Sequence, residues 1–167
     1  MKFVFTLLLC ISALYSHDFI TLMLKSKSGD HLQFKGVGYS LFCHPHGVFT
    51  ISEFMHDPQV PSECKQELQK VSKTIQRRYG TALQNRLHLE QRYHIRSKDG
   101  FCVIYFNDNK TYSQVMLEQG LGVIRKEFLS QDRWFQYRLK KAQNLAKREK
   151  RGIWSFPFVA ECFEALK

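Results

Sequence analysis

The cysteines and histidines of one short segment are the residues whose types and spacing carry the most evident chemistry. The segment reads Cys43-His44-Pro45-His46, and Cys64 follows at the start of a predicted helix. Two imidazoles and two thiolates, from Cys43, His44, His46 and Cys64, are a ligand set that zinc accepts. However, a spacing of two between histidines is unusual for zinc, and the export predicted below favours oxidation. We therefore expect a Cys43–Cys64 disulfide beside two solvent-facing histidines, with zinc as the alternative.

The first residues have the layout of a secretory signal peptide. Lys2 gives a positive start, residues 3–14 are an unbroken run of apolar and small residues, and Ser16 is small. The run is too short to span a membrane as a helix. We therefore expect removal of residues 1–16 and a secreted or periplasmic protein. A buried first strand or helix is the alternative interpretation.

Four cysteines remain after this cleavage, and an even number of cysteines in an oxidising compartment can pair. They are Cys43, Cys64, Cys102 and Cys162, which allow three pairings. Beside the expected Cys43–Cys64 bond, Cys102 in a predicted core strand and Cys162 near the chain end either pair or stay buried as small apolar residues.

The chain is strongly basic. Its 25 Lys and Arg against 15 Asp and Glu give a formal net charge of +10, and loss of Lys2 with residues 1–16 leaves 24 against 15, or +9. Such a charge attracts polyanions, including nucleic acids, anionic lipid head groups and acidic cell-wall polymers, without specifying one of them. Much of the excess lies in residues 133–151. We expect a monomer whose partner is nucleic acid or another polyanion, with no transmembrane segment after cleavage.

Hydrophobic periodicity predicts one domain of the α+β class. Strands are expected over residues 19–24, 31–42, 48–54, 87–96 and 101–106. Helices are expected over residues 62–83, 112–122 and 133–151. Five short strands with one helix inserted between the third and the fourth are typical of a small closed barrel of the OB type.

Residues 112–155 resemble a known family. YSQVMLEQGLGVI is followed by a charged helix that reads AQNLAKREKRGIWS. This order is similar to the C-terminal part of the staphylococcal nuclease (thermonuclease) family, where N-x-x-L-V-x-x-G-x-A precedes A-x-x-x-A-K-x-x-x-x-G-I-W. The resemblance implies a five-stranded OB-type barrel over residues 17–155, with an inserted helix, two C-terminal helices and a tail at 156–167.

The resemblance also implies a chemistry. Active members cleave DNA or RNA phosphodiesters: a carboxylate pair holds Ca²⁺, a glutamate assists the attacking water, and two arginines neutralise the developing charge. These residues lie in a D-G-D-T loop, an R-L-x-G-I-D-x-P-E strand end and a Y-G-R turn. For the loop, Asp18 and Asp30 are the candidates here, and either one is a candidate Ca²⁺ ligand.

The second family segment has two registers in this sequence. In residues 33–41 the arginine is replaced by Gln33, whereas in residues 48–59 the acids Glu53 and Asp57 remain without an arginine beside them. We favour the second register, because it leaves five strands after the signal peptide is removed.

The catalytic arginines are missing in either register. No arginine stands between His17 and Gln76, and KDGF at 98–101 has glycine or phenylalanine in place of the arginine of the third segment. Each lost guanidinium contact removes about two to three powers of ten in rate. We therefore expect a degenerate nuclease site that binds nucleic acid or another polyanion without efficient cleavage, with Ca²⁺ as cofactor only if the family site is partly retained.

Two alternative functions stay open. One is an active nuclease with a rearranged site, whose candidate catalytic residues are Asp30, Lys35, Glu53, Asp57 and Arg96. The other is a periplasmic interaction protein with no nucleic-acid role. For a nucleic-acid binder the expected contacts are Lys35, Arg77, Arg78, Arg125, Lys126, Lys140, Lys141 and Lys147, with Tyr39, Phe128 and Tyr137 as candidates for stacking on bases.

Overall fold

The computed structural model describes residues 19–28, 30–125 and 132–165. The predicted signal peptide, Asp18, Lys126 and Phe128 therefore lie outside the described residues. In this described part, no helix has the length and apolar character that crossing a membrane requires.

Five strands close a barrel, which confirms the predicted fold class. They are β1 (Ile20–Ser28), β2 (His31–Lys35), β3 (Ser40–Pro45), β5 (Arg92–Lys98) and β6 (Phe101–Tyr105). Their order around the barrel is β1-β2-β3-β6-β5, and β1 pairs with β5 to close it. Neighbouring strands are antiparallel except β3 and β6, which run parallel.

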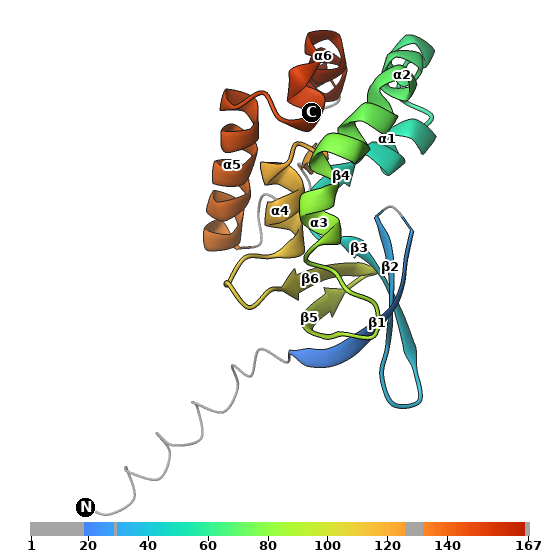
Figure 1. Cartoon of the computed structure of the whole chain (residues 1–167), viewed down its shortest axis with the longest axis vertical. Helices are drawn as coiled ribbons and strands as arrows, with labels where there is room; N and C mark the ends of the chain where they lie inside the picture. The colour runs from blue at the N-terminus through green and yellow to red at the C-terminus, as the bar shows by residue number, and fades with distance from the viewer. Residues whose placement is uncertain (1–18, 29, 126–131, 166–167) are drawn as a thin grey trace, which may run out of the picture.

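The helices gather at one end of the barrel, with α4 between α5 and β6 (Figure 1). Their bounds are α1 (Ile51–His56), α2 (Ser62–Tyr79), α3 (Thr81–Gln84), α4 (Tyr112–Glu118), α5 (Arg133–Arg148) and α6 (Pro157–Ala165), with a 3₁₀ helix, η3 (Gly152–Ser155). Two short strands, β4 (Val48–Thr50) and β7 (Gly122–Ile124), form a separate sheet.

Three of the predicted strands are built differently in the structure, and the one predicted over residues 87–96 begins only at Arg92. Residues 31–42 supply β2 and the start of β3, joined by a turn in which Gly38 has a φ of 79°, a conformation that glycine adopts without strain. Residues 48–54 form a strand only as far as Thr50. There a capping box begins α1, because the Thr50 hydroxyl accepts from the Glu53 backbone N–H and the Glu53 carboxylate accepts from the Thr50 N–H. The third barrel strand is therefore β3.

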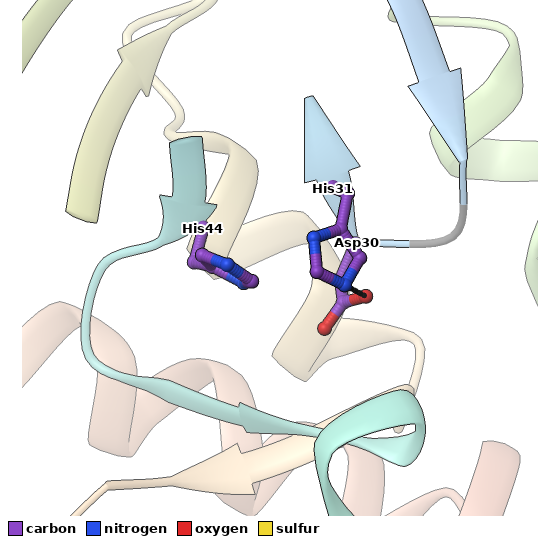
Figure 2. Close-up of side chains that lie close together, drawn as sticks. All are labelled: Asp30, His31 and His44. Atoms are coloured by element: carbon purple, nitrogen blue, oxygen red, sulfur yellow. Dashed lines mark ion pairs between the residues drawn. The ribbon is translucent and has the colours of Figure 1, made fainter. Parts of the chain in front are cut away.

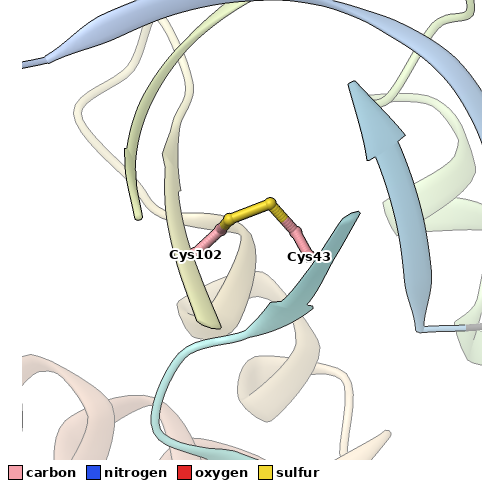
Figure 3. Close-up of a disulfide and its surroundings, with 2 residues drawn as sticks. All are labelled: Cys43 and Cys102. Carbon is pink, nitrogen blue, oxygen red and sulfur yellow. A yellow bond between two sulfur atoms is a disulfide. The ribbon is translucent and has the colours of Figure 1, made fainter. Parts of the chain in front are cut away.

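The predicted Cys43–Cys64 disulfide is wrong. Cys43 is bonded to Cys102 and Cys64 to Cys162, with Cα–Cα distances of 5.5 Å and 5.8 Å. Cys43 and Cys102 meet inside the barrel from the neighbouring strands β3 and β6 (Figure 3). Cys64 lies on α2, which packs against α6 and its Cys162. The two cysteines that are close in sequence belong to different layers of the molecule, and the predicted tail contains a helix tied to the domain.

The Gly-Ile-Trp sequence after α5 closes the core through a tight backbone contact. Ile153 is fully buried and Trp154 nearly so, and the Ile153 N–H donates to the Gly120 carbonyl at 2.9 Å. Gly152 has a φ of 56°, and a Cβ atom at this position would collide with the Gly120 carbonyl oxygen. Glycine is therefore required here for both conformation and space.

Replacing Gly152 by alanine tests this contact. We expect Gly152→Ala to lower the free energy of unfolding by about 3 kcal/mol or more, because left-handed strain adds to a backbone collision. Gly38→Ala is the matched control, since Gly38 has a similar φ but nothing within 4 Å of an added Cβ, and we expect a loss of about 1 kcal/mol. Urea unfolding followed by circular dichroism measures both, and equal losses would show that the close approach is not limiting.

Candidate functional site

One rim of the barrel presents a row of outward-facing side chains. The residue pairs Lys98–Phe101 and Phe101–His44 run across β5, β6 and β3, and His31 at the start of β2 continues the row. Side chains alternate along a strand, so the neighbours of His44 and Phe101 in sequence, Cys43 and Cys102, point into the barrel core. The rim therefore brings together residues that are far apart in the sequence.

Asp30, His31 and His44 form a cluster on this rim (Figure 2). Each offers one potential ligand atom, and these atoms lie within 4.8 Å of one another. Asp30 Oδ1 is 3.7 Å from His31 Nε2, and the two imidazole rings meet edge to face with centroids 4.4 Å apart. The Asp30 side chain is only 2% exposed, whereas that of His31 is 64% exposed, so the cluster extends from the interior to solvent.

The Asp30 carboxylate accepts a hydrogen bond at one oxygen and has no hydrogen-bond partner at the other among the described residues. The Thr50 hydroxyl donates to Asp30 Oδ2. Asp30 Oδ1 and His44 Nδ1 are both buried without a hydrogen-bond partner among the described residues. Buried polar atoms without partners are rare, and they commonly mark a place where an ion or an ordered water binds. The cluster therefore has free ligand capacity on two of its three members.

Arg125 and Glu53 form an ion pair next to the rim. Arg125 follows β7, and its guanidinium contacts the Glu53 carboxylate on α1. The guanidinium carbon lies 5.3 Å from the ring centroid of Phe49 and 5.4 Å from that of Phe101. Glu53 also accepts from the Thr50 backbone N–H. Its two oxygens are therefore engaged, one by the helix cap and one by Arg125.

Two neighbouring ionisable groups are shifted toward their neutral forms. Burial, and secondarily the charge of Asp30, raises the pKa of the Tyr112 hydroxyl, so this phenol stays protonated. Burial, followed by the positive charges of Arg96 and Lys98, lowers the pKa of His46 below its usual value. His46 is therefore neutral at neutral pH and adds no charge to the rim.

The structure brings three of the predicted catalytic residues, Asp30, Glu53 and Arg96, to this region. Asp30 and Glu53 are linked through Thr50, which contacts both carboxylates. Arg96 on β5 acts electrostatically on His46, and its guanidinium lies 5.3 Å from the ring centroid of Phe19.

The other two predicted catalytic residues lie elsewhere. Lys35 is the last residue of β2, at the opposite end of that strand from His31. Asp57 caps the C-terminus of α1 and accepts a hydrogen bond from the Gln59 N–H at 2.8 Å. Lys35 and Asp57 therefore have separate structural positions and do not join the cluster.

The structure does not form the alternative zinc site predicted from Cys43, His44, His46 and Cys64. Cys43 and Cys64 are each bonded to another cysteine, so neither thiolate is available as a ligand. His44 instead turns toward His31 and Asp30, whereas His46 contacts the ring of Phe135 at 5.7 Å between centroids.

The predicted nucleic-acid contacts are split between exposed and engaged side chains. Lys140 and Lys141 are exposed on α5. Lys147 pairs with Glu164 of α6 and lies 4.5 Å from the ring centroid of Trp154, so it holds α6 and the core tryptophan.

Sequence reasoning missed two residues of this surface, His31 and Trp134. His31 stood in the D-G-D-T-like loop beside Asp30, and only the register of β2 on β3 shows that it meets His44. Trp134 lies on the first turn of α5 and stacks with Tyr137. Its i, i+3 spacing from Tyr137, together with the lysines that follow, is a signal that the sequence does contain.

Comparison with known families gives a match to part of the chain. A family model described as staphylococcal nuclease homologue matches residues 61–156, which is more than half of the chain and includes Phe101 and Arg125. The cluster at Asp30, His31 and His44 lies before the matched range. A comparison with curated proteins gave no match.

Thr50 can be tested as the link between Asp30 and α1. We expect Thr50→Val to lower the free energy of unfolding by about 1–3 kcal/mol, because it removes both the cap and the hydrogen bond to a buried carboxylate. Thr50→Ser keeps the hydroxyl and should retain most of the stability. Urea unfolding at neutral pH compares the variants. Full stability in Thr50→Val, which keeps the methyl group and loses only the hydroxyl, would show that the two hydroxyl contacts contribute little.

Proposed function

The chain belongs to the staphylococcal nuclease family, and on that premise we propose that it is an exported domain that binds nucleic acid without cutting it efficiently. The proposal rests on an exposed aromatic and basic surface beside the rim, and on the replacement or engagement of the groups that cleavage requires. Separate observations support binding, the lack of efficient cleavage and export.

The observation that carries the proposal is an exposed aromatic pair at the start of α5. Trp134 and Tyr137 are 68% and 56% exposed, and their rings stack at 22° with centroids 5.7 Å apart. Lys140 and Lys141 follow on the same helix and are also exposed. Aromatic rings next to lysines are typical of surfaces that hold single strands, because bases stack on the rings while the cations follow the phosphates.

This aromatic pair is close to the barrel rim. Phe135, the residue after Trp134, contacts the ring of His46 at 5.7 Å between centroids. The His46 ring in turn lies 6.4 Å from that of Phe101, over which the Arg125 guanidinium is placed. A strand that stacks on Trp134 can therefore extend toward the cationic groups of the rim.

Among the described residues, the groups at this rim are poorly suited to stabilising a phosphodiester transition state. The second family arginine is replaced in this chain by a glycine or by Phe101, and neither side chain carries a charge. Glu53 is engaged by the Thr50 N–H and by Arg125, which leaves it unsuited to activate a water molecule. A guanidinium that is paired with a carboxylate also offers less charge to a phosphate than a free one. Binding without efficient cleavage is the outcome that this arrangement favours.

The Ca²⁺ ion that the family implies does not fit the donors around Asp30. Ca²⁺ prefers roughly six to eight oxygen ligands. In the cluster formed by the described residues, Asp30 supplies the single carboxylate and the other two members are imidazoles. We therefore assign no catalytic step to Ca²⁺.

Hydrolysis at a rearranged site is the second candidate function, and one observation favours it. The Arg125 guanidinium lies 5.4 Å from the ring centroid of Phe101, so a different element supplies a guanidinium near the place where the family arginine is absent. In this alternative, Arg125 would leave Glu53 and bind the phosphate when substrate arrives.

Export is supported by the N-terminal sequence and by the cysteines. Residues 1–16 have the layout of a signal peptide, and the two disulfides are compatible with an oxidising compartment. An envelope interaction protein without a nucleic-acid role would share these features, so nucleic-acid binding itself is the property to test. The monomeric state stays a prediction.

Fluorescence anisotropy with a labelled single-stranded oligonucleotide tests binding. We expect micromolar or tighter affinity at low salt that falls steeply as salt rises. Trp134→Ala should weaken binding about 5- to 150-fold, because one stacked base contributes about 1–3 kcal/mol. Changing Lys140 and Lys141 to glutamine should reduce the salt slope by up to about 1.4.

Phe158→Ala is the control for this experiment. Phe158 is an aromatic residue that is 49% exposed, but it lies on α6 and is not among the predicted nucleic-acid contacts. We expect its replacement to leave the affinity unchanged. If the protein shows no micromolar binding at low salt, the proposed function fails and the envelope interaction protein takes its place.

Incubation with DNA and RNA, with and without Ca²⁺, tests cleavage. We expect no rapid, chelator-sensitive loss of substrate, because in the described part of the chain Asp30 is the one carboxylate of its cluster and the family arginine has no counterpart in KDGF at 98–101. Rapid cleavage would contradict this expectation. If that cleavage were abolished by Arg125→Ala and retained in Lys35→Ala, the rearranged nuclease would be the correct function.

A further inference from the structure

We propose that Asp30, His31 and His44 bind a divalent transition metal ion of the zinc class at the barrel rim. This inference goes beyond the proposed function, because it requires no nucleic acid. It also replaces the Ca²⁺ of the family with an ion of different ligand preference.

The spacing of the three donors is compatible with one ion after a small adjustment. Their ligand atoms lie within 4.8 Å of one another, whereas ligand atoms around a tetrahedral zinc with bonds of about 2.0–2.1 Å are roughly 3.3 Å apart. His31 is 64% exposed, so its ring can rotate toward the other two donors without disturbing the core. Asp30 and His44 are held in place by the barrel.

Two of the donors are buried and unmatched in the way that a metal ligand would be. Asp30 Oδ1, the oxygen that faces His31 Nε2, has no hydrogen-bond partner among the described residues, and neither has His44 Nδ1. A buried carboxylate oxygen without a hydrogen-bond partner is unfavourable unless a cation or a donor reaches it. A bound cation would satisfy the carboxylate and the imidazole together.

The mixture of donors selects the class of ion. Imidazole nitrogen suits zinc and its neighbours in the first transition row, whereas Ca²⁺ and Mg²⁺ prefer a shell of oxygens. The Thr50 hydroxyl donates to the remaining oxygen of Asp30, and outer hydrogen bonds of this kind fix the orientation of a ligating carboxylate. With three protein ligands, the ion would keep at least one position open toward the solvent side, where His31 is exposed.

Isothermal titration calorimetry of the disulfide-bonded protein with ZnCl₂ alone tests the inference. We expect one Zn²⁺ per chain with micromolar or tighter affinity, and much weaker binding of CaCl₂ under the same conditions. His31→Ala and His44→Ala should each weaken Zn²⁺ binding at least 10-fold. Asp30→Asn should do the same while keeping a group that can accept from Thr50.

His88→Ala is the matched control, because His88 is exposed in the loop before β5 and outside the cluster. His31→Ala is the decisive variant, since the exposed His31 ring contributes little to folding. A Co²⁺ titration followed by visible absorption gives a second measurement. Binding should produce ligand-field (d–d) absorption bands of Co²⁺, and these bands should be lost in His31→Ala. Unchanged Zn²⁺ affinity in His31→Ala, or Ca²⁺ affinity equal to that of Zn²⁺, would overturn the inference whether or not nucleic acid binds.

Discussion

The parallel contact between β3 and β6 is the interaction on which both the barrel and its rim depend. It contains two residue pairs, one of which joins His44 to Phe101. So short a parallel contact supplies few hydrogen bonds, and the Cys43–Cys102 disulfide links the same strands from the inside. Because side chains alternate along a strand, the residues next to these cysteines face outward. Closing the barrel therefore also sets His44 beside Phe101 at the rim.

Thr50 connects this rim to the helical layer. Its hydroxyl donates to Asp30 and accepts from the Glu53 N–H, while its own N–H donates to the Glu53 carboxylate. Glu53 in turn neutralises Arg125. Both oxygens of Glu53 are therefore engaged, whereas Asp30 keeps Oδ1 without a hydrogen-bond partner among the described residues. Exposed lysines lie on β5 (Lys98) and on α5 (Lys140 and Lys141), and such bases attract an anionic macromolecule without opposing a small cation at Asp30.

The sequence was sufficient for the class of fold but not for the site. Periodicity and the Gly-Ile-Trp motif depend on local patterns, and they predicted the barrel, α2 and the last long helix. The Cys43–Cys102 disulfide and the His31–His44 contact depend on strand register, which no local pattern specifies. The Cys64–Cys162 disulfide depends on the packing of α2 against α6, which local patterns do not specify either. The strand predicted over residues 48–54 ends at Thr50 for a reason that the sequence contains. Thr50 and Glu53 have the spacing of a capping box, and this helix-start signal overrides the apolar alternation around it.

The Arg125–Glu53 pair bears on whether the guanidinium near Phe101 could replace the missing family arginine. Electrostatic catalysis depends on where a charge stands, so a residue from another element can in principle replace a missing arginine. However, both side chains of the pair are largely buried, at 17% and 22% exposure, and separating a buried pair leaves each charge without compensation. A phosphate must therefore bind Arg125 more strongly than Glu53 does before any charge stabilisation is gained. Stacking of bases on Trp134 and Tyr137 would require no such exchange, so under the proposed function this architecture favours binding over cutting.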